Sequence, residues 1–378
     1  MKKILLSVLA FLLLVGTLLG DVCNTADISD LSKVKAASED EASVYDSEEM
    51  RGIWVSYNDF SDLGFYNKSE SKYIKNVKKF LKTVKKKKYN VVFLHVRAFD
   101  DAIWPSETFP ASEYLTKKAS RNKTAAETYK YDPLQDFIDV ADSYGIEVHA
   151  WLNPYRVTID KFLDPSVAKN QKRVKTAVSE LLEYDIDGIH FDDYFYHSQG
   201  GYVKSYKSNS VYSVDISAAK KRKYVNKLIK AVYKQVHKVD GLVFGISPQG
   251  NYDNDMNSGA DVKTWLSKSG YVDYVAPQIY WSDQYGKNGD VTMYSDRLTQ
   301  FCDLRTNEDV KLYIGLALYR TGTASSYDVG WSRSSTNLKE QIELLREAEC
   351  EGFIMFSARY INRSATKAEQ KNYLKILD

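Results

Sequence analysis

The sequence predicts a (β/α)8 barrel, a TIM barrel, and three observations lead to this prediction. From Met50 onward, eight short apolar runs recur, and each is followed by a loop and an amphipathic stretch. Strands that alternate with helices indicate a parallel sheet, and eight such pairs in about 325 residues are the number that closes a barrel. A GxGxxG motif follows none of the runs. That disfavours the alternative, a doubly wound open sheet.

The expected elements can be placed in order along the chain. The strands are the apolar runs 52–57, 91–97, 147–153, 188–194, 242–249, 274–281, 312–318 and 352–359. The helices are the amphipathic stretches 70–88, 132–144, 167–184, 218–238, 261–269, 291–306, 337–349 and 366–377. Two long loops, 98–131 and 197–217, leave the C-terminal ends of the second and fourth strands. In a parallel barrel both loops lie at the same end, where they would wall a binding site.

The alternation of side chains indicates which face of each strand turns inward. In the fourth strand, Ile189 and Phe191 share one face, whereas His190, Asp192 and Tyr194 share the other. Helices cover the outside of a barrel, so the apolar face packs against them and the more polar face lines the interior. The polar groups gather toward the C-terminal strand ends, and we expect the functional site there.

The N-terminal region has the pattern of an export signal. Lys2 and Lys3 precede an apolar stretch at 4–19 that is short for a membrane span. We therefore expect a signal peptide at 1–23 with an uncertain cleavage site, a polar linker at 24–48 and one barrel domain at 49–378. Cleaved secretion is the favoured outcome and an uncleaved anchor the alternative; both place the protein outside the cytoplasm.

Composition narrows the range of partners. Lys plus Arg number 52 against 50 Asp plus Glu, a net charge of +2 that gives no electrostatic case for a nucleic-acid partner. The 29 Tyr, 15 Phe and 6 Trp suit stacking on sugar rings, although Tyr is also a good core residue. Cys302 and Cys350 could form one disulfide, but two free thiols are slightly favoured.

A pair of neighbouring carboxylates ends the fourth strand. Asp192 and Asp193 repel each other, which raises a pKa and can keep a proton available for acid catalysis. As neighbours on a strand they would point to opposite faces, one catalytic and the other supportive. The alternative is a pair that caps the following loop.

Two other acidic runs carry weaker signals. Asp100 and Asp101 follow the second strand beside Trp104, and we expect Asp101 to contact a sugar hydroxyl and Trp104 to offer a stacking platform. A simple turn of polar residues is the alternative. Asp253 and Asp255 resemble a calcium loop only superficially, because the remaining spaced ligands are missing.

Three of the five histidines, His95, His149 and His190, fall on inward positions of consecutive strands. Together with Asp192 they could form the metal site of a deacetylase. The favoured interpretation is core histidines that bond to interior neighbours. We expect no metal and no cofactor.

The expected seventh strand, 312–318, ends without a carboxylate. Many barrel glycosidases pair an acid on the fourth strand with a nucleophile on the seventh. A retaining mechanism of that kind is therefore disfavoured, which leaves an inverting or a substrate-assisted route.

Six segments resemble the glycosyl hydrolase-like family 10 of bacterial envelope proteins. They are RGIWVS at 51–56, VRAFDDAIWPSE at 96–107, GIEVHAWLNPYR at 145–156, DGIHFDDY at 187–194, FGISP at 244–248 and VAPQIYW at 275–281. The resemblance covers about residues 50–360. It implies a TIM-barrel glycoside hydrolase and, for some members, action on peptidoglycan glycan strands stripped of their peptides.

Carried over residue by residue, the resemblance implies a set of site residues. They are Asp192 and Asp193, Arg97 and Asp101, Trp151, Asn153 and Arg156, and Gln278, Tyr280 and Trp281. Family 18 chitinases, which use the substrate's own acetamido group, carry Asp-Gly-x-Asp-x-Asp-x-Glu on the fourth strand. Aligned on Asp187 and Gly188, this chain matches at Asp192 but has Tyr194 in place of the Glu.

We therefore expect a secreted glycoside hydrolase of cell-wall-type glycans. Asp192 and Asp193 would be catalytic, and Trp104, His190 and Tyr194 would join the substrate-binding residues named above. A catalytically silent carbohydrate-binding barrel and the metal-dependent deacetylase are the alternatives. The expected partner is a glycan, with no nucleic acid and no stable membrane insertion unless the signal stays uncleaved.

Overall fold

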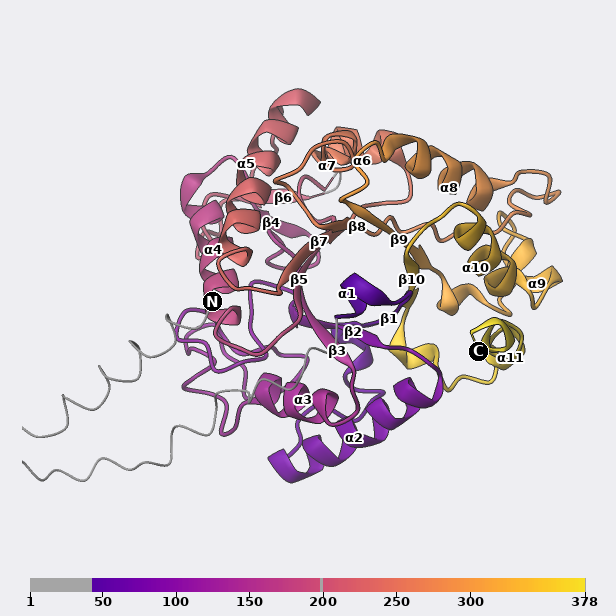
Figure 1. Cartoon of the computed structure of the whole chain (residues 1–378). Coiled ribbons are helices and arrows are strands. Elements are labelled where there is room, and N and C mark those ends of the chain that lie inside the picture. The colour runs from indigo at the N-terminus through magenta and orange to yellow at the C-terminus, as the bar shows by residue number, and fades with distance from the viewer. Residues whose placement is uncertain (1–42, 198–199, 378) are drawn as a thin grey trace, which may run out of the picture. The chain divides into compact units, whose positions relative to one another are not determined.

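A computed structural model describes residues 43–197 and 200–377 and confirms the predicted barrel. Eight parallel strands close in the order β1-β10-β9-β8-β7-β5-β3-β2, so that the first strand pairs with the last (Figure 1). The strands are β1 (Met50–Val55), β2 (Val91–Arg97), β3 (Glu147–Leu152), β5 (Gly188–Asp192), β7 (Val243–Ser247), β8 (Tyr274–Val275), β9 (Lys311–Leu316) and β10 (Gly352–Phe356). Outside the barrel, β4 (Lys161–Leu163) pairs with β6 (Gly201–Val203).

The helices surround the barrel as expected, with one exception (Figure 1). They include α2 (Glu70–Lys86), α3 (Pro133–Asp142), α4 (Ala168–Leu181), α5 (Ala218–Val236), α8 (Met293–Leu304), α10 (Asn337–Glu347) and α11 (Lys367–Tyr373), with the short α9 (Gly330–Arg333) after β9. The exception is the helix expected at 261–269, which is only α7 (Val262–Trp265) and follows a second short helix, α6 (Tyr252–Ser258).

The barrel separates two apolar cores. Outward side chains such as Val92, Ile189 and Phe191 pack under the helices, whereas Trp54, Phe93 and Tyr274 fill the lumen. The predicted alternation is therefore confirmed. Two glycines make room for large lumen side chains. A Cβ on Gly188 would lie 2.7 Å from the His149 ring, and one on Gly245 would lie 2.0 Å from the Tyr274 ring.

The end of the barrel where the strands begin is covered by a short helix, α1 (Val44–Ser47). Val44 and Tyr45 pack against the lumen core, and the Tyr45 hydroxyl donates to the Asp273 carbonyl at 3.2 Å. The expected linker at 24–48 is therefore wrong for residues 43–48, because two apolar side chains in an acidic stretch suffice to anchor it. The rest of that linker and the expected signal lie outside the described residues.

The structure also bears on two further expectations, about membrane-spanning helices and about a disulfide. In the described part of the chain, no helix is long and apolar enough to cross a membrane. Cys302 and Cys350 are free thiols whose sulfur atoms lie 3.8 Å apart.

Candidate active site

Asp192 lies in the lumen at the C-terminal end of β5 and is only 7% exposed. Its Oδ1 accepts from Nε2 of Gln278 at 3.1 Å and from the backbone N–H of Asp193 at 2.9 Å. The same Gln278 nitrogen donates to the Ser247 carbonyl on β7, which fixes the amide between the two strands. Burial raises the pKa of Asp192, while these donors and the Arg156 charge oppose the rise.

Asp193 joins Asp192 instead of pointing away from it. The strand ends at Asp192, so the alternation that would separate the two side chains no longer applies, and the carboxyls interact by hydrogen bonding. Burial and the Asp192 charge hold the pKa of Asp193 well above its usual range, whereas Gln249 acts in the opposite direction. The prediction of opposite faces is wrong, and the two groups form one titrating pair.

A third carboxyl, Asp255, lies beside this pair. It is fully buried in α6, and its Oδ1 accepts from the backbone N–H of Gln249 at 2.9 Å. Burial and then the Asp193 charge hold the pKa of Asp255 well above its usual range. Sequence reasoning considered Asp255 only as a metal ligand and missed its proximity to Asp193. Gln249, which follows β7, meets Asp193 only once the barrel closes, so no local pattern indicates that the three residues lie together.

Arg156 connects the acidic pair to the loop after β2. Its guanidinium carbon lies 4.4 Å from the centre of the Tyr194 ring and 4.7 Å from that of Phe99. The side chain is 8% exposed, and its Nε has no partner among the described residues. Arg156 is therefore a positive group at the site that is held by ring faces and that keeps donor capacity for a ligand.

Below the acidic pair, several buried polar atoms lack partners in the described structure. His95 stacks on Trp151 at 3.7 Å between ring centres, and both of its ring nitrogens are unpaired, as is Nε1 of Trp151. Asn153 donates to the Ala98 carbonyl at 3.0 Å, but its Oδ1 is unpaired. Buried polar groups without partners are costly, so these atoms suit a ligand that bonds to them.

Partly exposed aromatic side chains surround this end of the barrel. Tyr280 contacts Tyr319 and Phe356, with ring centres 5.8 and 5.9 Å apart, and Trp281 lies against Gly250. Tyr57 was not among the expected residues, and its ring meets those of His95, Phe99 and Tyr114 edge-on. Its position just after β1 is the signal that sequence reasoning could have used.

Two expected substrate contacts are structural. Arg97 is fully buried, pairs with Asp100 and donates to the Asn153 carbonyl at 2.7 Å. The register between β2 and β3 shifts between His95 and Arg97, and this irregularity takes Arg97 off the lumen alternation. Trp104 is 2% exposed, and its Nε1 donates to Glu180 of α4 at 2.9 Å. The prediction that Trp104 stacks on a sugar is wrong, since neither face of its ring is exposed.

The histidines do not form a metal site, so the deacetylase hypothesis is wrong. His190 uses Nδ1 on the Tyr274 hydroxyl at 3.0 Å and Nε2 on Ser247 at 3.0 Å, and His149 meets the same hydroxyl at 2.9 Å. Burial lowers the pKa of His149 to about 3. His190 is thus a core side chain rather than a substrate contact. Within the described residues, no group of three or more His, Cys, Asp or Glu could hold a metal ion.

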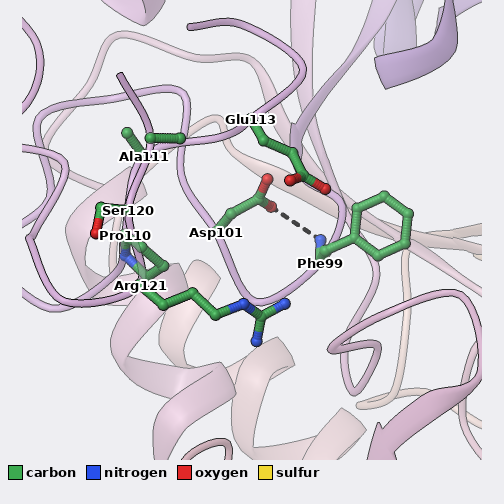
Figure 2. Close-up of a pocket in the computed structure, with 8 residues that line it drawn as sticks. Phe99, Asp101, Pro110, Ala111, Glu113, Ser120 and Arg121 are labelled. Atoms are coloured by element: carbon green, nitrogen blue, oxygen red, sulfur yellow. Dashed lines mark hydrogen bonds between the residues drawn. The ribbon is translucent and has the colours of Figure 1, made fainter. Parts of the chain in front are cut away.

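Asp101 lies at a small cavity in the loop after β2, which we call the mouth cavity. Its Oδ1 accepts from the backbone N–H groups of Ala98 and Phe99 at 3.0 and 2.8 Å. Figure 2 shows Asp101 with Glu113 beside it and the Arg121 side chain extending toward Phe99. Asp101 therefore shapes the loop and also lines a cavity of about 70 Å³.

Comparisons with solved structures agree with the fold. The endo-1,4-β-mannanase of Rhizomucor miehei superposes with a TM-score of 0.57 at 10% identity, covering 87% of this chain and 95% of that chain. The glycoside hydrolase domain of PgaB from Bordetella bronchiseptica gives a TM-score of 0.53 at 12% identity and covers 86% of this chain and 98% of that domain. At these identities the similarity shows the barrel fold alone.

Comparisons of sequence go further. The chain is 28% identical over 386 residues to glycosyl hydrolase DigH of Escherichia coli (strain K12), covering 85% of each chain. It is 27% identical over 382 residues to glycosyl hydrolase YngK of Bacillus subtilis (strain 168), covering 85% of this chain and 71% of that protein. The family model described as Glycosyl hydrolase-like 10 matches residues 49–162 and 157–333. The chain belongs to the Glycosyl hydrolase-like 10 family.

Proposed function

We propose that the protein is a secreted glycoside hydrolase that cleaves cell-wall-type glycans, with peptidoglycan strands as the substrate. The observation that carries the proposal is the pair Asp192 and Asp193, two interacting carboxyls at the C-terminal end of the barrel whose pKa values are both raised. Two hydrogen-bonded carboxyls with raised pKa values favour holding one proton between them and can supply acid and carboxylate chemistry together.

The surroundings assign different roles to the two carboxyls. Asp193 has the more strongly raised pKa and is partly exposed, so it keeps its proton and donates it to the glycosidic oxygen. Asp192 accepts hydrogen bonds from Gln278 and the Asp193 backbone, and the Arg156 charge also favours its ionised form, so we assign it the carboxylate role. As a carboxylate it orients the acetamido group of an N-acetylated sugar or activates a water molecule.

The buried unpaired atoms support a substrate rich in hydroxyl and amide groups. His95 and Asn153 interact with each other, and Nε1 of Trp151 beside them has no partner in the described structure, so this group of polar atoms can bond to a polar ligand. The flat aromatic rings at the same end suit the C–H faces of sugars. Family membership adds the expectation of glycosidic chemistry.

The test is the release of reducing ends from purified peptidoglycan strands with and without stem peptides. We expect release from the peptide-free strands, lost in the Asp192→Asn variant. The anomer of the first product separates two routes: retention indicates assistance by the acetamido group, and inversion indicates direct attack by water. Absence of release from these strands and from chitin and β-glucan oligomers would contradict the proposal.

A silent carbohydrate-binding barrel is the second candidate function. The observation behind it is that the described residues Leu316, Ala317 and Leu318 at the end of β9 carry no carboxylate. Calorimetry distinguishes the two functions. Glycan binding without turnover, unchanged in Asp192→Asn, would favour the silent barrel.

A further inference from the structure

Two cysteines that are 48 residues apart in the sequence meet in the layer between the helices and the barrel. Cys302 lies in α8, and Cys350 lies between the end of α10 and the start of β10. Figure 1 shows α8 and α10 as neighbours on the outside of the barrel. The two Sγ atoms are 3.8 Å apart, whereas in a disulfide they are about 2.0 Å apart. Only a small further approach of the two side chains therefore separates this pair from a covalent bond.

Hydrogen bonds and an ion pair around the cysteines hold the two segments together without using sulfur. Arg305, at the end of α8, pairs with Glu351 at 2.6 Å and donates to the Glu349 carbonyl at 3.1 Å. The Cys350 backbone N–H donates to the Leu345 carbonyl of α10 at 2.9 Å. Two cysteines can be bridged only where the backbone already brings them close. Here that condition is met by contacts on both sides of Cys350.

The two thiols differ in how readily they can react. Cys302 is partly exposed, whereas Cys350 is only 7% exposed. The hydrogen bond between them lowers the pKa of the Cys302 thiol, and the Arg305 charge acts in the same direction against the effect of burial. The same hydrogen bond and burial raise the pKa of Cys350. Since the thiolate is the reactive form, Cys302 is the thiol that meets a reagent from solvent first.

We propose that Cys302 and Cys350 form a site of oxidative modification, where a disulfide compound from solvent converts the two thiols into one intramolecular disulfide. The Cys302 thiolate attacks one sulfur of the compound, which forms a mixed disulfide and releases the first thiol. Cys350 then attacks Sγ of Cys302 and releases the second thiol. The protein loses two electrons and two protons, and the disulfide compound gains both and leaves as two thiols.

The bond would close a long loop at a distance from the acidic pair. The segment between the two cysteines includes β9, α9 and α10. Closing so long a loop restricts the unfolded chain and stabilises the folded one. Cys350 lies just before the start of β10, at the end of the barrel opposite to Asp192, which lies where β5 ends. The bond is therefore a covalent support of the barrel wall and goes beyond the proposed function.

A pair of thiols that merely pack in the core is the alternative explanation, since free cysteine is often buried as a small apolar side chain. Packing alone needs neither contact between the sulfur atoms nor exposure of one of them, and this pair has both. The sequence alone slightly favoured free thiols, because the distance between Cys302 and Cys350 is a tertiary property. Proteins outside the cytoplasm meet disulfide oxidants, and the proposed secretion is consistent with such a reaction.

The test follows the two thiols in the purified full chain, in which C23S removes the remaining cysteine. One sample is incubated with oxidised glutathione and the other with dithiothreitol, and the thiols are counted after unfolding. We expect two thiols in the reduced sample and none in the oxidised sample, with a cross-linked peptide that joins Cys302 to Cys350 and no bound glutathione. The oxidised sample should melt about 5 °C higher, because the bond constrains a long loop.

Single substitutions test the order of the steps. C350S should accumulate glutathione on Cys302, because no second thiol is left to displace it, whereas C302S should leave the buried Cys350 unmodified. The double variant C302S/C350S should melt at the same temperature after either treatment.

Three results would overturn the proposal: two free thiols in the wild-type pair after oxidation, glutathione that stays bound to that pair, or a shift in melting temperature that the double variant keeps. The thiol count of the wild-type pair decides even where a variant fails to fold. No glycan enters the test, so its outcome is independent of the proposed cleavage.

Discussion

The two ends of the barrel both hold buried carboxyls, yet they use them differently. Where the strands begin, burial raises the pKa of Glu147 to about 7 and also raises that of Asp273. Where the strands end, burial raises the pKa values of Asp192 and Asp193. A raised pKa alone therefore does not distinguish a catalytic group from a structural one.

The two ends of the barrel differ in the hydrogen-bond partners of their polar side chains. Just before each of four strands, a side-chain oxygen accepts a hydrogen bond from a backbone N–H of the neighbouring strand. The acceptors and their donors are Asn90 with Arg51, Asp187 with Val148, Asp273 with Phe244 and Glu351 with Leu312, at 2.7–2.9 Å. At the other end, the partners of Asp192 include a side-chain amide and a second carboxyl, and unpaired donors lie nearby. The hydrogen bonds to the backbone at the first end stabilise the fold, whereas the polar groups without a partner at the second end are suited to binding a ligand.

The largest expected effect separates the two ends directly. Asp192→Asn keeps the shape of the side chain but removes its charge, so kcat should fall about 10²–10⁴-fold while the protein stays folded. Asp187→Asn at the other end should leave kcat within a few-fold and lower the free energy of unfolding by about 1–3 kcal/mol. Steady-state kinetics and urea denaturation of both variants check this, and equal kcat values in the two variants would contradict the comparison.

The next effect concerns the pH profile. Asp193 acts when protonated, so wild-type activity should decline as pH rises through its raised pKa. Asp192 acts when ionised, so activity should also decline as pH falls through its own pKa. Asp193→Asn should lower kcat about 10²-fold and abolish the decline at high pH, since Asn has no proton to lose. A variant that retains both limbs would show that another group is the acid.

A smaller effect is expected in the stability of the covered end. Glu147 accepts a hydrogen bond from the Val44 backbone N–H at 2.6 Å, and burial raises its pKa in the folded protein from the ordinary 4.5 to about 7. Its contribution is full below pH 4.5 and is lost as pH rises through 7, by about 2 kcal/mol. Glu147→Gln should remove this pH dependence. Urea denaturation at pH 5 and pH 8 measures it, and an unchanged difference between the two pH values would contradict the assignment.

The smallest effect concerns Asp255, which lies beside the acidic pair. Burial holds the pKa of Asp255 well above its usual range, which favours the neutral form that Asn imitates, so Asp255→Asn should keep kcat within a few-fold. Asp255→Ala removes the acceptor for the Gln249 N–H and should cost about 1–2 kcal/mol in unfolding free energy. A large loss of kcat in Asp255→Asn would instead make Asp255 part of the proton chemistry.

The sequence by itself determined the barrel and the inward positions on its strands. Alternation is a local property with a period of two, so the interior places of Phe93, His190 and Asp192 follow from the chain alone. The position of a polar group at a strand end also follows, because parallel strands share one C-terminal edge. This reasoning holds only while the strand continues regularly.

Only the tertiary structure decided what happens where that regularity stops. The shift in register between His95 and Arg97 takes the arginine off the lumen alternation, and the end of β5 lets Asp193 turn toward Asp192. The burial of Trp104 against α4 and the electrostatic interaction of Asp255 with Asp193 join segments that are distant in the chain. Such contacts depend on strand order, loop path and closure of the barrel, which no local pattern of residues encodes.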